Sequence, residues 1–124
     1  MPIKTKRWND PVAAGDGQRL LVCRIRPRGV RKEDEPWDAW VKELAPSKPL
    51  LDAFHGKHAP PITWREYEHR YLAEMREQGY RIAGLAGQVK AGETLTLLCS
   101  SACVDPTHCH RTLLARLIEE AARG

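Results

Sequence analysis

Side chains that can do chemistry gather in one short segment near the C-terminus. In chain order they are Cys99, Cys103, His108, Cys109, His110 and Arg111. Thiolates are nucleophiles and soft metal ligands, and an imidazole can act as a base, an acid or a ligand beside them. This segment is therefore the first place where we expect a functional site.

A second segment concentrates positive charge. Arg24, Arg26 and Arg28 alternate along it, and Gly29 follows. A planar guanidinium group donates paired hydrogen bonds that match phosphate and carboxylate groups. The segment therefore favours an anionic ligand. The alternative is that these arginines are solvated or paired with the acidic run at residues 33–35.

Each of these segments follows an apolar run that predicts a buried strand. The runs cover residues 19–25 and 94–99. If the two strands are parallel neighbours, their carboxyl ends share one edge of the sheet, which is where ligands of such sheets bind. The last helix, expected to begin after Asp105 with Pro106 in its first turn, would add free backbone N–H groups to the same rim.

Three functions are compatible with such a rim. The leading one is the binding of an anionic ligand, either a phosphate or nucleotide or the phosphate of a nucleic acid. The residues expected to bind it are Arg24, Arg26, Arg28, Gly29 and Arg111.

The second function is an enzyme with a thiolate nucleophile, for which Cys99, Cys103 and Cys109 are available, and with His108 or His110 as acid or base. Cys109 and His110 are the pair expected to carry the chemistry. The third is a structural zinc module whose ligands would be Cys99, Cys103 and Cys109 with one neighbouring histidine, His108 in the first instance or else His110. The segment has no C-x-x-C pair, and no arginine stands where the phosphate loop of cysteine-dependent phosphatases has one. The spacing therefore selects neither chemistry.

Composition bounds the class of protein. The chain has 124 residues, 42% of them hydrophobic and 29% charged, which predicts one globular domain over residues 1–124. No apolar run is long enough to span a membrane, and the N-terminal residues do not have the pattern of a secretory signal. We therefore expect a cytoplasmic protein with reduced cysteines and no membrane partner. The net charge of +4 is a mild bias toward anionic partners. The oligomeric state is left open.

Periodicity and capping residues predict the remaining elements. A short edge strand is expected over residues 3–8. Helices are expected from Asp34 to Leu44, after Ser47, from Thr63 to a closing Gly79, over residues 80–89, and after Asp105. This order predicts an α/β fold: a small, mainly parallel sheet flanked by about five helices in a three-layer, Rossmann-like arrangement.

Several of these segments together resemble the domain-of-unknown-function family 488. They are Arg26-Pro27-Arg28-Gly29, Lys42-Glu43-Leu44-Ala45-Pro46-Ser47, Leu97-Leu98-Cys99 and Cys109-His110-Arg111. The resemblance extends over nearly the whole chain. It implies a cytosolic, mostly prokaryotic group with an α/β fold and no established activity, and it draws attention to the residues just quoted.

The chain departs from the family pattern at three places. Cys23 stands where the family has an aspartate, and Arg26 stands where it has a tryptophan. The loop at residues 100–104 is longer than usual and adds Cys103. A family carboxylate at the end of the first buried strand has thus been exchanged for a thiol.

Overall fold

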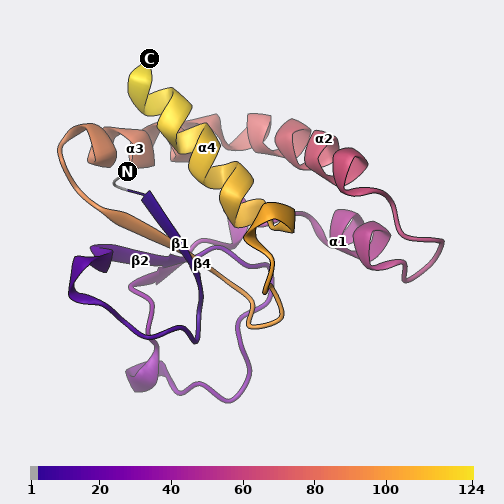
Figure 1. The fold of residues 1–124 in the computed structure, drawn as a ribbon, viewed down its shortest axis with the longest axis horizontal. Helices are drawn as coiled ribbons and strands as arrows, with labels where there is room; N and C mark the ends of the chain where they lie inside the picture. The colour runs from indigo at the N-terminus through magenta and orange to yellow at the C-terminus, as the bar shows by residue number, and fades with distance from the viewer. Residues whose placement is uncertain (1–2) are drawn as a thin grey trace.

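A four-stranded parallel sheet forms the centre of the chain, of which the computed structural model describes residues 3–124 (Figure 1). The strands are β1 (Ile3–Arg7), β2 (Gln18–Leu21), β3 (Ala39–Trp40) and β4 (Leu95–Cys99). Their spatial order is β1-β4-β2-β3. The expected parallel pairing of the two apolar runs is therefore found, with Leu21 opposite Leu98.

Burial explains which run lies where. All five residues of β4 are buried, because this strand is central and is covered on both faces. β1 alternates apolar and basic residues and lies at the edge, as expected. The run at residues 19–25 forms a shorter strand than expected, although the amide of Val22 still donates to the carbonyl of Leu98 at 2.9 Å.

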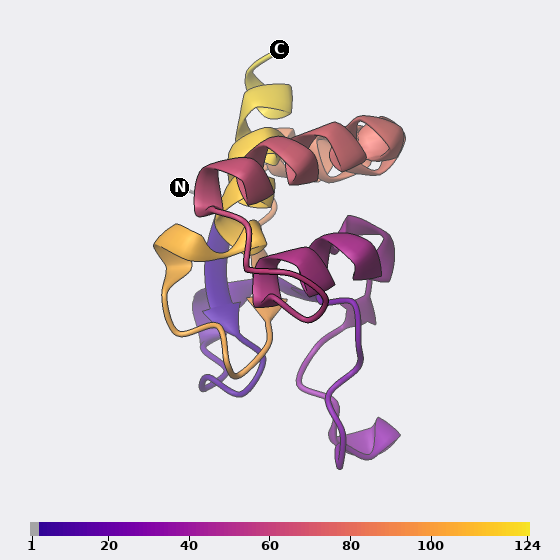
Figure 2. The ribbon, with the colours of Figure 1, turned by 90° about the vertical axis from the view of Figure 1, so that its right-hand side faces the viewer.

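Four α-helices accompany the sheet (Figures 1 and 2): α1 (Lys48–His55), α2 (Trp64–Met75), α3 (Gly79–Lys90) and α4 (His110–Arg123). The expected caps are confirmed, because Ser47 Oγ accepts from the amide of Leu50 and Thr63 Oγ1 accepts from the amide of Glu66. No helix in residues 3–124 is long and apolar enough to cross a membrane.

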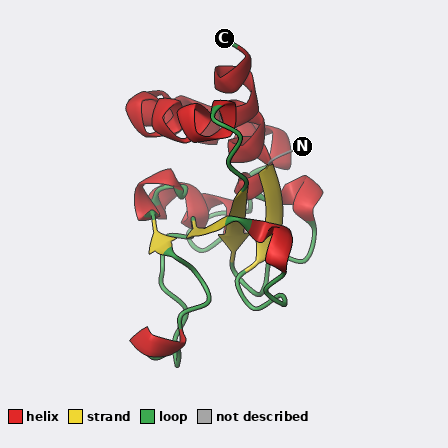
Figure 3. Cartoon of the chain, turned by 90° about the vertical axis from the view of Figure 1, so that its left-hand side faces the viewer, coloured by secondary structure: helices red, strands yellow, loops and turns green. Residues whose placement is uncertain are grey.

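The sheet has a different cover on each face. One face, with Leu20, Val22 and Leu97, packs against apolar residues from all four helices. The other face, with Leu21 and Leu98, is covered by loop residues such as Trp37. Figure 3 shows the long helices gathered on one side of the strands. The α/β class is confirmed, but the three-layer arrangement with about five helices is not found in the described chain.

The prediction of a helix over residues 34–44 is wrong. This segment forms two 3₁₀ turns, Lys32–Asp34 and Lys42–Leu44, with β3 between them. Trp37 and Trp40 match the spacing of one helix face, but residues 39–40 pair with the free edge of β2 and form a strand instead. Trp37 then enters the loop-covered core, while Trp40 is 38% exposed and donates its indole N–H to the carbonyl of Cys23 at 2.8 Å.

Two helix boundaries also differ from expectation. Gly79 opens α3 instead of closing α2, because the backbone stays helical through a 3₁₀ turn at Arg76–Gln78. The last helix begins at His110 and not at Pro106. The carboxylate of Asp105 caps a separate 3₁₀ turn, Pro106–His108, and Cys109 is then extended before α4 begins.

A buried ion-pair cluster lies before β2. Asp16 is buried and contacts Lys6 Nζ at 2.9 Å and the guanidinium of Arg19. Its neighbour Gly17 has a φ of +62°, and a Cβ there would lie 2.2 Å from the carbonyl oxygen of Thr94. Only glycine fits this close approach, which lets the chain enter β2 beside β4.

Candidate functional site

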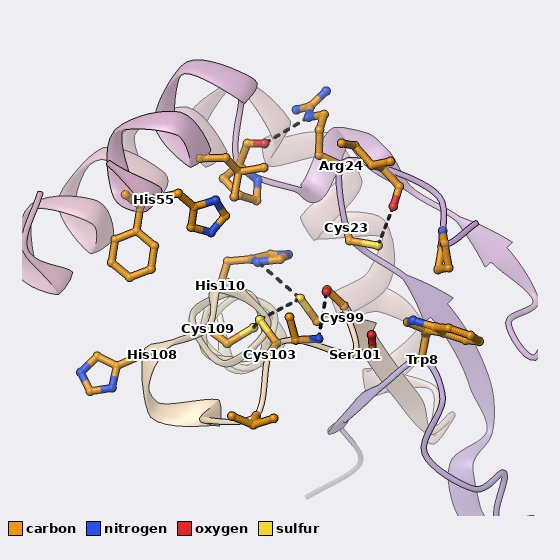
Figure 4. Close-up of a pocket in the computed structure, with 18 of the residues that line it drawn as sticks. Trp8, Cys23, Arg24, His55, Cys99, Ser101, Cys103, His108, Cys109 and His110 are labelled. Atoms are coloured by element: carbon orange, nitrogen blue, oxygen red, sulfur yellow. Dashed lines mark hydrogen bonds between the residues drawn. The ribbon is translucent and has the colours of Figure 1, made fainter. Parts of the chain in front are cut away.

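A pocket of about 640 Å³ opens where β2 and β4 end (Figure 4). One wall is the segment from Cys23 to Arg28, and the facing wall is the segment from Cys99 to Asp105. These are the two segments expected to share a rim, and the β2–β4 register places them side by side. Helix α1 closes a third side with Leu51, Phe54 and His55.

Three cysteine sulfurs lie together at one side of this pocket. The Sγ atom of Cys103 is 3.4 Å from that of Cys99 and 3.1 Å from that of Cys109, and all three lie within 4.8 Å of one another. Cys99 and Cys109 are buried, whereas Cys103 is half-buried. We call Cys99, Cys103 and Cys109 the cysteine cluster; its three soft donors could hold a metal ion.

The three thiols of the cysteine cluster differ in pKa. Hydrogen bonds from Cys109 and Cys99, with further help from the charge of Arg111, hold the pKa of Cys103 well below that of an ordinary thiol. The hydrogen bond to Cys103 raises the pKa of Cys99 and also that of Cys109, and burial adds to both shifts. These directions favour Cys103 as the first thiol of the cluster to ionise.

His110 faces the cysteine cluster with a defined tautomer. Its Nε2 lies 2.7 Å from the carbonyl oxygen of Val22, and a carbonyl can only accept, so Nε2 carries the proton. Burial lowers the pKa of this ring, which favours the neutral form. The unprotonated Nδ1 is then directed toward Cys99, 3.9 Å from its Sγ atom (Figure 4).

His108, the first of the two histidines expected as a metal ligand, faces elsewhere. It is exposed, and its Nδ1 lies 2.9 Å from a carboxylate oxygen of Asp105. Its ring also packs edge-on against Trp64, with centroids 5.1 Å apart. In Figure 4 it lies on the far side of Cys109 from His110. The structure therefore brings the three expected cysteine ligands together and places His110, the alternative histidine, beside Cys99.

Arg111 contacts the backbone of the cysteine cluster and is not among the residues that line the pocket. It is only 4% exposed. One terminal nitrogen donates to the carbonyl of Cys103 at 3.3 Å, while Nε and the other terminal nitrogen have no hydrogen-bond partner within residues 3–124. Its positive charge acts on the cluster, because it helps to lower the pKa of Cys103.

The other expected anion-binding residues divide into two groups. Arg24 and Arg26 line the pocket but are engaged: Arg24 donates to the carbonyl of Pro46 at 3.1 Å, and Arg26 pairs with Glu35 at 2.8 Å. Arg28 also lines the pocket and is exposed, and its guanidinium has no hydrogen-bond or ion-pair partner in the described chain.

The remaining expected residue, Gly29, belongs to the turn after Arg28. It has a φ of +78°, in the region that favours glycine. It is exposed and is not among the lining residues. Its place in the turn suits a conformational role.

Cys23 lies in the wall of the pocket at the end of β2. It is buried, lines the pocket and donates its thiol to the carbonyl of Ile25 at 3.3 Å. Burial raises the pKa of Cys23 to about 11, so the group stays a neutral thiol near pH 7. This wall of the pocket therefore carries no negative charge from Cys23.

The sequence alone did not reveal the aromatic part of the pocket. Four such residues line it from three separate places in the chain: Trp8, the neighbours Phe54 and His55 of α1, and Tyr67 of α2. The rings of Phe54 and Tyr67 pack at a tilted angle of 36°, with their centroids 4.4 Å apart. In the sequence, the spacing of aromatic residues along a helix indicates only core packing. Phe54 and His55 become pocket residues because α1 lies against the sheet edge, which the sequence does not show.

Comparisons with known proteins place the chain in a family. The sequence model described as "Active DUF488-N3 subclade" matches residues 3–122, so the chain belongs to domain-of-unknown-function family 488. It is 40% identical over 115 residues to the uncharacterised protein YeaO of Escherichia coli K12, covering 93% of this chain and 95% of that protein.

A second relative is the uncharacterised protein Rv3073c of Mycobacterium tuberculosis H37Rv. It is 36% identical over 75 residues, which is 60% of this chain and 61% of that protein. No solved structure matches the chain. The family description calls the subclade active but names no reaction.

Proposed function

We propose that this protein binds a small anionic molecule in the pocket at the carboxyl edge of the sheet. One observation carries the proposal: three arginines, Arg24, Arg26 and Arg28, line a single cavity. Among the lining residues of the described chain, Asp105 is the one carboxylate, and it is already paired with His108. A concave site with an excess of one charge concentrates ligands of the opposite charge.

Arg28 is the residue that we expect to contact the anion. Arg24 and Arg26 already donate hydrogen bonds within the protein. Arg24 donates to the carbonyl of Pro46 in the segment before α1, and Arg26 donates to the carboxylate of Glu35. Arg28 keeps its guanidinium donors free at the pocket wall. A guanidinium group in this state can bind a phosphate or carboxylate through two parallel hydrogen bonds.

The size and lining of the pocket indicate a ligand with an apolar or aromatic body. A volume of about 640 Å³ lies within the range of sites for whole small molecules and far exceeds the needs of a phosphate ion. Leu51, Phe54 and Tyr67 supply apolar and aromatic surface inside it. A nucleoside monophosphate combines the required charge, ring and size, and it is the probe that we choose.

The expected catalytic pair, Cys109 and His110, is not part of this proposal. Both residues line the pocket but are buried, and the free nitrogen of His110 is directed toward Cys99. Of the cysteine cluster, Cys103 has the most access to a pocket ligand, because it alone is half-buried.

Calorimetric titration tests the proposal. We expect adenosine monophosphate to bind, with adenosine and inorganic phosphate each binding more weakly. Arg28→Ala should weaken the binding of adenosine monophosphate by about tenfold, since a hydrogen bond to a charged group contributes about 1.5 kcal/mol or more. Arg31→Ala is the matched control, because Arg31 is exposed nearby but does not line the pocket.

Two results would contradict the proposal. One is the absence of binding by adenosine monophosphate, and the other is an equal loss of affinity in the Arg28→Ala and Arg31→Ala variants. A single-stranded oligonucleotide serves as the comparison ligand. Tighter binding of that strand, with a steep dependence on salt, would assign the arginines to nucleic-acid phosphates instead.

A further inference from the structure

We propose that the cysteine cluster and Nδ1 of His110 together bind one divalent ion of the zinc class. This metal centre is independent of the anionic ligand proposed above, although it lies beside the same pocket. The donor set is three sulfurs and one imidazole nitrogen, a combination that favours zinc over oxygen-seeking ions such as magnesium or calcium.

The distances between the three sulfurs suit a tetrahedral site, and Nδ1 of His110 lies 3.9 Å from one of them, Sγ of Cys99. A zinc ion bonded to sulfurs at about 2.3 Å separates two of them by about 3.8 Å. The cluster has sulfur pairs at 3.1 and 3.4 Å, with all three sulfurs inside 4.8 Å. Small side-chain movements would therefore open the cluster around an ion. Binding the three sulfurs as thiolates releases to solvent whichever protons they still carry.

The hydrogen bond of His110 is the feature that distinguishes it from His108. Metal-ligating histidines usually donate their other ring N–H to a carbonyl or a carboxylate, which fixes the tautomer and the ring direction. His110 has this arrangement, with Nε2 bound to the carbonyl of Val22 and Nδ1 directed toward the Sγ atom of Cys99. His108 is instead bound to Asp105 and packed on Trp64.

Arg111 supplies a second, independent observation. Three thiolates around a divalent ion leave one negative charge in a buried place, and such a charge needs a nearby partner. The guanidinium of Arg111 is buried, donates to the backbone of Cys103, and has two nitrogens without a hydrogen-bond partner within residues 3–124. It has no ion-pair partner in the described chain either. A negatively charged metal centre would compensate this arginine.

Metal stoichiometry of the full-length protein, measured by native mass spectrometry with added zinc, is the first part of the test. We expect one zinc per chain in the wild type, in Cys23→Ser and in His108→Ala. Cys103→Ser and His110→Ala should weaken zinc binding at least tenfold in competition with a chelator. A wild-type protein that binds no zinc, or a His108→Ala variant that loses it while His110→Ala keeps it, would overturn the proposal.

A spectroscopic measurement on the wild type avoids dependence on buried substitutions. In ¹¹³Cd-loaded, ¹⁵N-labelled protein, we expect a cadmium resonance typical of three sulfurs and one nitrogen, with scalar coupling to Nδ1 of His110. Coupling to a nitrogen of His108, or the absence of any coupling to a histidine, would refute the assigned fourth ligand.

Discussion

Zinc should raise the thermal stability of this protein by an amount that can be worked out in advance. A ligand that binds only the folded state at 100 times its dissociation constant adds about 2.7 kcal/mol to the free energy of unfolding. A chain of 124 residues has an unfolding entropy of about 0.26 kcal/mol/K, from about 2.1 cal/mol/K per residue. The midpoint of thermal unfolding should therefore rise by about 10 °C.

Thermal unfolding followed by circular dichroism, with zinc and then with a chelator, measures this shift. Cys103→Ser removes one ligand of the cysteine cluster and should abolish most of the shift. Cys23→Ser removes the fourth thiol of the chain, which lies outside the cluster, and should preserve it. Equal shifts in the wild type and the Cys103→Ser variant would refute the reasoning, because they would mean that zinc acts elsewhere.

Three further predictions concern single residues. Hydrogen bonds and salt bridges with Lys6 and Arg19 hold the pKa of Asp16 well below its usual range. The Asp16 carboxylate therefore stabilises the fold above about pH 4, and this contribution is lost as the pH falls toward the folded-state pKa. In urea titrations, Asp16→Asn should reduce the loss of unfolding free energy on the acid side. Gly17→Ala should cost about 1–3 kcal/mol of unfolding free energy, whereas Gly29→Ala, also at positive φ but with open space around it, should cost less. Peptide mapping after brief alkylation of chelator-treated protein should find Cys103 modified first, and added zinc should protect it. First modification of another cysteine would contradict the claim that Cys103 is the first thiol to ionise.

The strands and their shared edge could be predicted from the sequence because short apolar runs carry a direct signal of burial. Residues 94–99 and the first half of residues 19–25 form the central strands, and their parallel pairing follows from the long helical connection between them. The caps at Ser47 and Thr63 were also legible, since each satisfies a free amide three residues later. Local chemistry was sufficient at these places.

Other features depend on partners that are distant in sequence. Trp37 and Trp40 fit a helix by spacing, yet the unpaired edge of β2 pulls their segment into a strand. The choice between His108 and His110 depends on where the 3₁₀ turn ends and α4 begins, and on the carbonyl of Val22, which lies 88 residues away from His110. No pattern within the segment reports these contacts.

The measurement that tests the proposed function most directly is an NMR titration of ¹⁵N-labelled protein with adenosine monophosphate. We predict saturable shifts confined to the two pocket walls, at residues 23–28 and 99–105, and to Phe54 and His55 of α1. Saturable shifts on another surface, or no shifts at millimolar nucleotide, would contradict the assignment of this pocket as an anion site.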